Sequence, residues 1–235
     1  MPNKLQSQVF TTPGSISWTI PAGVTSCWVD VVGAGGGTYP PIPGSAVGGG
    51  GSGEYCQRVP LSCNSTDAWV SGGAISGVVG AGGGPASAGG FSSFGPFVCN
   101  GGKTNIVPGG RPTGGDGGGI GGVGTGTGTG GLPGTYEYNG FTGGSGGGQG
   151  SSTVQGYVSG AAINFFPGEV PVGGILCGGW GANSPFGIGG LNGSEFTNGT
   201  NATAIATGGG GGGVSVSMPV GTDGAGGRVQ VSWVS

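Results

Sequence analysis

The sequence has no histidine and very little charge, and these absences exclude several classes of protein. Of its 235 residues only five are Lys or Arg and eight are Asp or Glu, which gives a formal net charge of −3 at pH 7. Without histidine the chain cannot build a Ser-His-Asp or Cys-His nucleophilic site. Five basic residues cannot neutralise a track of phosphates, so we expect no nucleic-acid partner.

Long apolar runs and helical patterns are also missing. No run of about 20 apolar residues occurs, so we expect no membrane insertion. No segment has apolar residues at helical spacing, and Lys, Glu and Leu are scarce, which predicts almost no α-helix. A glycoside hydrolase needs two carboxylates about 5–10 Å apart, and Glu137 with Glu169 is a candidate pair. We interpret both as solubilising loop charges and expect no enzyme and no cofactor.

Cysteine is present in an odd number and without the Cys-x-x-Cys spacing of a zinc site, so we expect no metal centre. Cys27 and Cys56 lie in alternating apolar runs, which predicts small buried side chains. A Cys56–Cys63 disulfide across a hairpin is the alternative, and we favour unbridged thiols. The five residues are Cys27, Cys56, Cys63, Cys99 and Cys177.

Glycine is abundant, at 69 residues. Between Gly109 and Gly150 it recurs at every third position in two short series, which matches one turn of a polyproline-II helix. Such a helix has no internal hydrogen bonds, so its backbone groups must bond to neighbouring chains, and a face without side chains permits their approach. The spacing predicts packed polyglycine helices. The alternative is a flexible glycine linker.

Strand patterns at both ends of the chain favour the ordered alternative. Apolar and polar residues alternate over residues 16–20, 27–31 and 228–233, which is typical of half-buried strands. We expect the two ends to pair and to bury one set of side chains in a shared β-layer. That set is Trp18, Val29, Val31, Val229, Val231 and Trp233. Further strands are expected within residues 51–61, 68–84, 89–103 and 214–220.

We therefore predict one glycine-rich domain of mainly β class over residues 1–235. Residues 1–107 are its strand-rich part, residues 108–213 are polyglycine helices with loop inserts, and residues 214–235 are closing strands. The terminal strands form a β-layer that frames the bundle of polyglycine-II (polyproline-II-like) helices.

Several motifs in order carry a resemblance to a known family. They include PAGVTSCWVDVVGAGGG (21–37), VVGAGGG (78–84), GGGGGG (208–213) and GAGGRVQVSWV (224–234). Together they resemble the glycine-rich domain of bacteriophage tail-fibre and baseplate proteins. The tracts are also similar to the polyglycine adhesins at the tips of some long tail fibres, whose distal loops bind host receptors. In place of the helical attachment segment of such adhesins, this chain begins with strands.

The resemblance implies an extracellular virion protein of the tail fibre or tail tip that binds a host receptor without covalent chemistry. Its partners would be a host surface glycan or outer-membrane protein and other tail or baseplate proteins, with a homo-oligomer as a further option. The alternative functions are a non-adhesive part, such as a capsid decoration or a fibre–baseplate adaptor, and an antifreeze-like bundle. The last ranks lowest because only residues 124–130 suggest a regular threonine array.

Aromatic side chains in the inserts between glycine tracts are the candidate receptor-binding residues. Thin helices cannot bury a large ring between them, so these rings must lie at a helix end or outside, and aromatic clusters on loops mark recognition surfaces. The alternative is a hydrophobic cap over the end of the bundle. The candidates are Tyr136, Tyr138, Phe141, Phe165, Phe166, Phe186 and Phe196.

Overall fold

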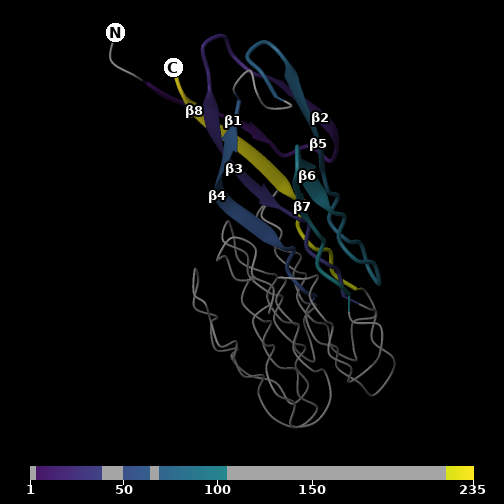
Figure 1. The fold of residues 1–235 in the computed structure, drawn as a ribbon. Helices are drawn as coiled ribbons and strands as arrows, with labels where there is room; N and C mark the ends of the chain where they lie inside the picture. Colours follow the sequence, from purple (N-terminus) through teal and green to yellow (C-terminus); the bar gives the residue numbers. More distant parts are fainter. Residues whose placement is uncertain (1–3, 39–49, 64–68, 105–220) are drawn as a thin grey trace, which may run out of the picture.

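The computed structural model describes residues 4–38, 50–63, 69–104 and 221–235, which form two facing antiparallel sheets and a set of extended glycine segments that continue from them (Figure 1). The first sheet has the strand order β1-β8-β3-β4 and the second β2-β5-β6-β7. No helix occurs within these four ranges. The strands are β1 (Leu5–Phe10), β2 (Gly14–Thr19), β3 (Ser26–Val32), β4 (Tyr55–Ser62), β5 (Ala74–Val79), β6 (Ser92–Phe94), β7 (Phe97–Cys99) and β8 (Arg228–Val234).

The two ends of the chain pair, as the sequence predicts. β8 lies between β1 and β3 and is antiparallel to both, with Val231 opposite Val29 and Val229 opposite Val31. These four valines are fully buried, and Trp18 from the second sheet is buried in the same core. The core between the sheets therefore holds five of the six side chains expected there.

Trp233 is the exception, because it is only half-buried. It lies near the end of β8, between the buried Cys27 of β3 and Gln6 of the edge strand β1. Its ring contacts Trp18, with 5.3 Å between the ring centroids and a tilt of 51°. The expectation of full burial was wrong, since one neighbour of Trp233 is the edge strand β1, whose residues are all exposed or half-buried.

Strand β1 was not foreseen over most of its length, because it is an edge strand without a buried face. Its six residues, LQSQVF, are all exposed or half-buried. The segments 51–61, 68–84 and 89–103 contain β4, β5 and the β6–β7 hairpin, as expected. The strand predicted at residues 214–220 lies outside the described ranges.

Beyond β3 the backbone changes from strand pairing to a different hydrogen-bond pattern. The N–H groups of residues 33–38, here called the central rod, donate in turn to three different neighbouring segments. The acceptors are the carbonyls of Glu54, Gly90 and Ala225, followed by those of Gly51, Ser87 and Thr222, at 2.8–3.0 Å. Each neighbour is thus contacted again three residues later, which is the period of a polyproline-II-type helix.

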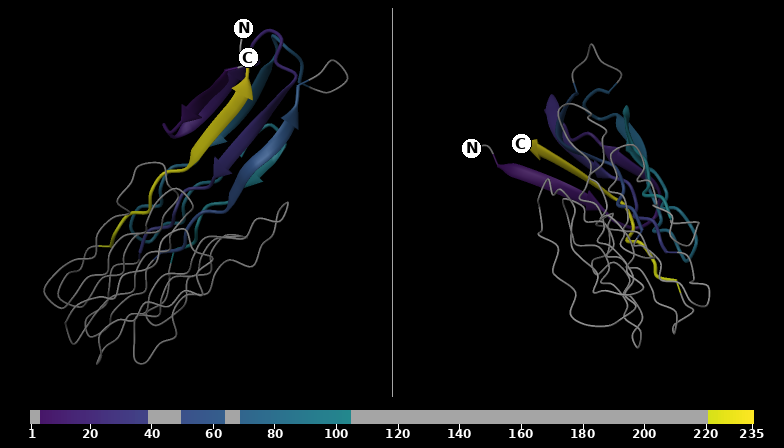
Figure 2. Two further views of the ribbon diagram at one scale, coloured as in Figure 1. Left: turned by 90° about the vertical axis from the view of Figure 1, so that its left-hand side faces the viewer. Right: turned by 90° about the horizontal axis from the view of Figure 1, so that it is seen from below.

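The neighbouring segments follow the same rule. Gly51 and Glu54 donate to Lys103 and Asn100, while Gly224 and Gly227 donate to Gly83 and Gly80. We call residues 33–38, 50–54, 80–90, 100–104 and 221–227 the glycine rods. Each continues a strand of the sandwich (Figure 2).

Glycine is required in the rods because the backbones touch. A Cβ atom on Gly33 would lie 2.1 Å from the carbonyl oxygen of Asn100, and one on Gly53 would lie 2.0 Å from that of Gly33. Neither distance is compatible with a side chain. These rods lie in residues 1–107 and 214–235, where strands were expected. The polyglycine helices predicted over residues 108–213 lie outside the described residues and stay a prediction.

Candidate functional site

The seven aromatic residues predicted to bind a receptor lie within residues 105–220 and therefore outside the described structure. The structure does place the points where that segment leaves and rejoins the described chain. Thr222 and Thr38 bond through backbone and side chain, with 3.0 Å between their hydroxyl oxygens, and Gly51 donates to the Lys103 carbonyl. Residues 39–49 and 105–220 are therefore both attached at the rod end, away from the two termini (Figure 1).

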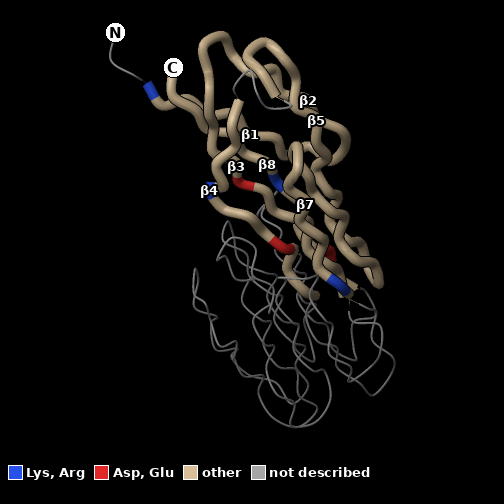
Figure 3. The backbone as a smooth tube through the Cα atoms, viewed as in Figure 1, with Lys and Arg blue, Asp and Glu red and all other residues tan. Residues whose placement is uncertain are grey.

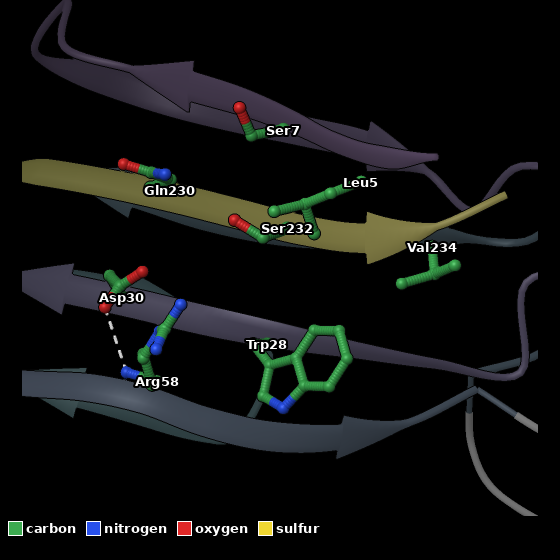
Figure 4. A pocket seen from close by; sticks show the side chains of 8 residues that line it. All are labelled: Leu5, Ser7, Trp28, Asp30, Arg58, Gln230, Ser232 and Val234. Atoms are coloured by element: carbon green, nitrogen blue, oxygen red, sulfur yellow. Dashed lines mark hydrogen bonds between the residues drawn. The ribbon is translucent and has the colours of Figure 1, made fainter. Parts of the chain in front are cut away.

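A second candidate surface is a hollow of about 500 Å³ on the outer face of the first sheet (Figure 4). Strands β1, β3, β4 and β8 all contribute to it. It combines one exposed indole, two charged side chains and several neutral hydrogen-bonding groups. The lining residues are Leu5, Ser7, Trp28, Asp30, Arg58, Gln230, Ser232 and Val234.

Strand alternation directs these side chains outward. Val29 and Val31 point into the core, so Trp28 and Asp30 lie on the opposite face of β3. Ser232 of β8 lies opposite Trp28, and Gln230 lies opposite Asp30. On the β8 side both residues therefore have a polar neighbour, and the Trp28 side chain stays 39% exposed.

A β-bulge in β4 brings an arginine to this face. Val29 lies opposite Val59 and Val31 opposite Cys56, so two residues of β4, Gln57 and Arg58, face Asp30 alone. Arg58 has φ = 50°, a left-handed conformation that is uncommon outside glycine, and its N–H donates to Asp30 Oδ1 at 2.9 Å (Figure 4). Bulges re-aim side chains, and strained residues concentrate at functional sites.

The electrostatics of the hollow centre on Asp30. Partial burial raises the pKa of its carboxyl group. Two opposing effects reduce this shift: the hydrogen bond from the Arg58 N–H, and the positive charges of Arg228 and Arg58. The Arg228 guanidinium also donates to the side-chain carbonyl of Gln230. Charge is otherwise sparse along the described backbone (Figure 3). Among the described residues, Asp30 is the one carboxylate lining this hollow.

Part of this hollow could have been found from the sequence. Trp28 and Asp30 alternate with buried valines, so a tryptophan on the outward face of a strand was already visible. The position of Arg58 could not be foreseen, because it depends on the bulge.

In the described ranges no three His, Cys, Asp or Glu side chains gather as a metal site, and no helix is long and apolar enough to cross a membrane.

Comparison with known families finds one match that spans nearly the whole chain. A glycine-rich domain family matches residues 11–234. The protein belongs to this glycine-rich domain family. The match begins just after β1 and ends at the last residue of β8, so it spans the glycine rods and every strand of the sandwich except the edge strand β1. No curated protein matches the sequence significantly.

Proposed function

We propose that this glycine-rich protein is a non-enzymatic adhesin of a bacteriophage tail fibre or tail tip, and that it binds a glycan on the host cell surface. The hollow on the outer face of the first sheet carries the proposal. There an exposed indole lies among carboxylate, guanidinium, amide and hydroxyl groups. The resemblance of the framing motifs to tail-fibre and baseplate proteins supports the virion setting.

A sugar fits this combination of groups better than an ion or a lipid. The apolar face of a pyranose ring can stack on the Trp28 indole, while its hydroxyl groups bond to donors and acceptors beside it. Asp30 accepts, Arg58 donates and Gln230 can do both. The opposite charges of Asp30 and Arg58 leave the hollow without a strong field of one sign, so a neutral glycan would enter without repulsion.

The long segment at the rod end offers a second place for recognition. Residues 105–220 leave and rejoin the described chain at the end opposite the termini. In a fibre joined through its sandwich end, this segment would face outward. The aromatic residues Tyr136 and Tyr138, with the other five candidates, would then meet a host glycan or outer-membrane protein.

One observation favours the alternative of a non-adhesive virion part. Leu5 and Val234 lie on the same hollow, close to the two termini, and they are 62% and 40% exposed. Exposed apolar side chains at the edge of a hollow are typical of protein–protein contacts. In this alternative, the outer sheet face would seat another tail or baseplate protein, or a second copy of this chain.

The test is binding of the fluorescently labelled protein to bacterial cells and to an array of bacterial surface polysaccharides. Trp28→Ala should weaken glycan binding about tenfold, as expected for an aromatic anchor. Phe91→Ala is the matched control, since Phe91 is 50% exposed but does not line the hollow. The control should bind like the parent.

Equal binding by Trp28→Ala and the parent would show that the hollow is not the glycan site. Binding lost only when the aromatic residues of 105–220 are changed to serine would move recognition to the rod end. A chain located inside the baseplate or on the capsid of an assembled particle would favour the structural alternative.

A further inference from the structure

The cysteines of the described chain lie in two close pairs inside the sandwich. The Cys56 and Cys99 sulfur atoms are 3.2 Å apart, and those of Cys27 and Cys63 are 3.9 Å apart. All four side chains are at most 2% exposed and are in the thiol form. Each of these cysteines thus has another cysteine in sulfur–sulfur contact, although the partners are 43 and 36 residues apart in sequence.

The two pairs join different parts of the fold. Cys56 belongs to β4 of the first sheet and Cys99 to β7 of the second, so this pair spans the core between the sheets. Cys27 belongs to β3, and Cys63 directly follows the neighbouring strand β4, where its N–H donates to the Thr25 carbonyl. The Cys56–Cys63 disulfide considered from the sequence does not fit, because each of its members faces a different cysteine.

We propose that these pairs close into two disulfides, Cys56–Cys99 and Cys27–Cys63, when the protein folds in an oxidising medium. In each closure two S–H bonds break and one S–S bond forms, and two protons and two electrons are released. A small disulfide such as oxidised glutathione takes up the electrons and protons and is reduced to two thiols. The proposal does not depend on the adhesin function.

The chemistry differs between the pairs. The contact between the two sulfur atoms lowers the pKa of Cys56, whereas the same contact, followed by burial, raises the pKa of Cys99. Burial, followed by the neighbouring Cys63, raises the pKa of Cys27 to about 12. These shifts belong to the closed sandwich, where the paired sulfur atoms are in contact, so they describe the folded thiol form and do not set the order in which the pairs close.

Burial controls when the bonds can form and break. A reagent cannot reach sulfur atoms that are at most 2% exposed, so closure requires the sheets to be still apart or transiently open. Once formed, both disulfides would be shielded from reductants by the same burial. A structural cross-link of this kind suits a protein that works outside the cell, where disulfides persist.

The experiment refolds the full-length chain in a buffer of oxidised and reduced glutathione, and then labels remaining thiols with iodoacetamide in denaturant. Two disulfides leave one of the five cysteines, Cys177, available for labelling. Peptide mapping without reductant should show 56–99 and 27–63 cross-links. The Cys99→Ala variant should keep only the 27–63 link and should label at Cys56 and Cys177.

Labelling of all five cysteines in the refolded parent would overturn the proposal. Cross-links with any other pairing, including 56–63, would overturn it as well.

Discussion

The sandwich and the glycine rods are built from the same chain segments, and different forces hold them together. In the sandwich, side chains such as Trp18, Ile75 and Phe94 fill the space between two sheets. In the rods, backbone carbonyls and N–H groups of neighbouring segments meet directly, with partners repeating every three residues. The sandwich is therefore stabilised by side-chain packing, whereas the rods can form only where side chains are absent from the positions at which their backbones meet.

The change between the two regimes occurs within single segments. β3 ends at Val32. At the next residue, Gly33, the Asn100 backbone already occupies the place that a Cβ atom would take. β8 is approached in the same way, through Gly224 and Gly227. Because each rod is the continuation of a strand, the sheets hold the rods in place at one end. Polar backbone groups in the rods are satisfied without a side-chain core.

The largest expected effect comes from adding one methyl group to a rod. A Cβ on Gly224 would lie 2.2 Å from the carbonyl oxygen of Gly35 and 2.3 Å from its carbonyl carbon. Backbone atoms on both sides would have to move, which breaks bonds along several rods at once. Gly224→Ala should cost about 4–5 kcal/mol or prevent folding, at the top of the range for single substitutions. Urea unfolding measures the loss.

The matched control lies two residues away in the same rod. A Cβ on Gly226 would have its nearest neighbour, the Gly80 carbonyl oxygen, at 3.7 Å, which is ordinary contact. Gly226→Ala should therefore change the free energy of unfolding by less than about 1 kcal/mol and can be stabilising, because alanine restricts the unfolded chain. Equal effects of the two substitutions would show that the rods are not packed backbone to backbone.

The strands of the sandwich were largely predictable from the sequence, and the rods that continue them were not. Alternation around Val29 and Val31 specifies both a strand and its buried face. The central rod, GAGGGT, lacks a regular three-residue glycine spacing, because a rod with neighbours on several sides requires glycine at more than one position per turn. A Cβ on Gly36 would lie 2.5 Å from the Lys103 carbonyl oxygen, and one on the adjacent Gly37 would lie 2.2 Å from that of Gly84.

The candidate site divides in the same way. Trp28 could be placed on an outer face by alternation alone. Arg58 reaches that face through a bulge with φ = 50°, and no residue pattern in YCQRVPLS indicates it. The cysteine pairs are also invisible in the sequence, since Cys56 meets Cys99 only when two sheets face one another. Contacts between sheets depend on the topology, which strand periodicity does not specify.

A smaller loss in the free energy of unfolding is expected from truncating a core side chain. The comparison is between Trp18 and Trp233, whose rings are in contact. Trp18 is 2% exposed, contacts Phe94 with 6.2 Å between ring centroids and also packs on Trp233. Trp18→Ala should cost about 3–5 kcal/mol in urea unfolding, as for other buried aromatic residues. Trp233→Ala should cost clearly less, because its half-exposed ring leaves a space that water can enter.

The order of these two tryptophans tests where the core ends. If Trp233→Ala proved as costly as Trp18→Ala, the side of the core next to β1 would be as well closed as its centre. A double variant adds the contact between the rings: its cost should fall below the sum of the single costs, because the two side chains touch.

The smallest effect concerns the pH dependence of stability in the outer hollow. Burial raises the pKa of Asp30, despite the opposing Arg58 N–H and the charges of Arg228 and Arg58. A carboxyl group whose pKa is higher in the folded than in the unfolded state stabilises the fold when it is protonated. This contribution is fully present at pH values below the unfolded-state pKa. That contribution is lost as the pH rises through the folded-state pKa. Ionised Asp30 at neutral pH is therefore a cost to the fold.

Asp30→Asn removes this ionisation and retains an oxygen that can accept from the Arg58 N–H. The free energy of unfolding of the parent, relative to the variant, should rise as the pH falls from 7 through the raised pKa, and level off below the ordinary value of 3.8. Urea unfolding of both proteins between pH 7 and pH 3.5 measures the difference, and Asp223→Asn, at an exposed site on a rod, controls for the change in net charge. A parent that instead lost stability relative to Asp30→Asn on acidification would mean that the arginines outweigh burial. The carboxylate would then be the favoured form in the fold, and the hollow would be held together by its charges.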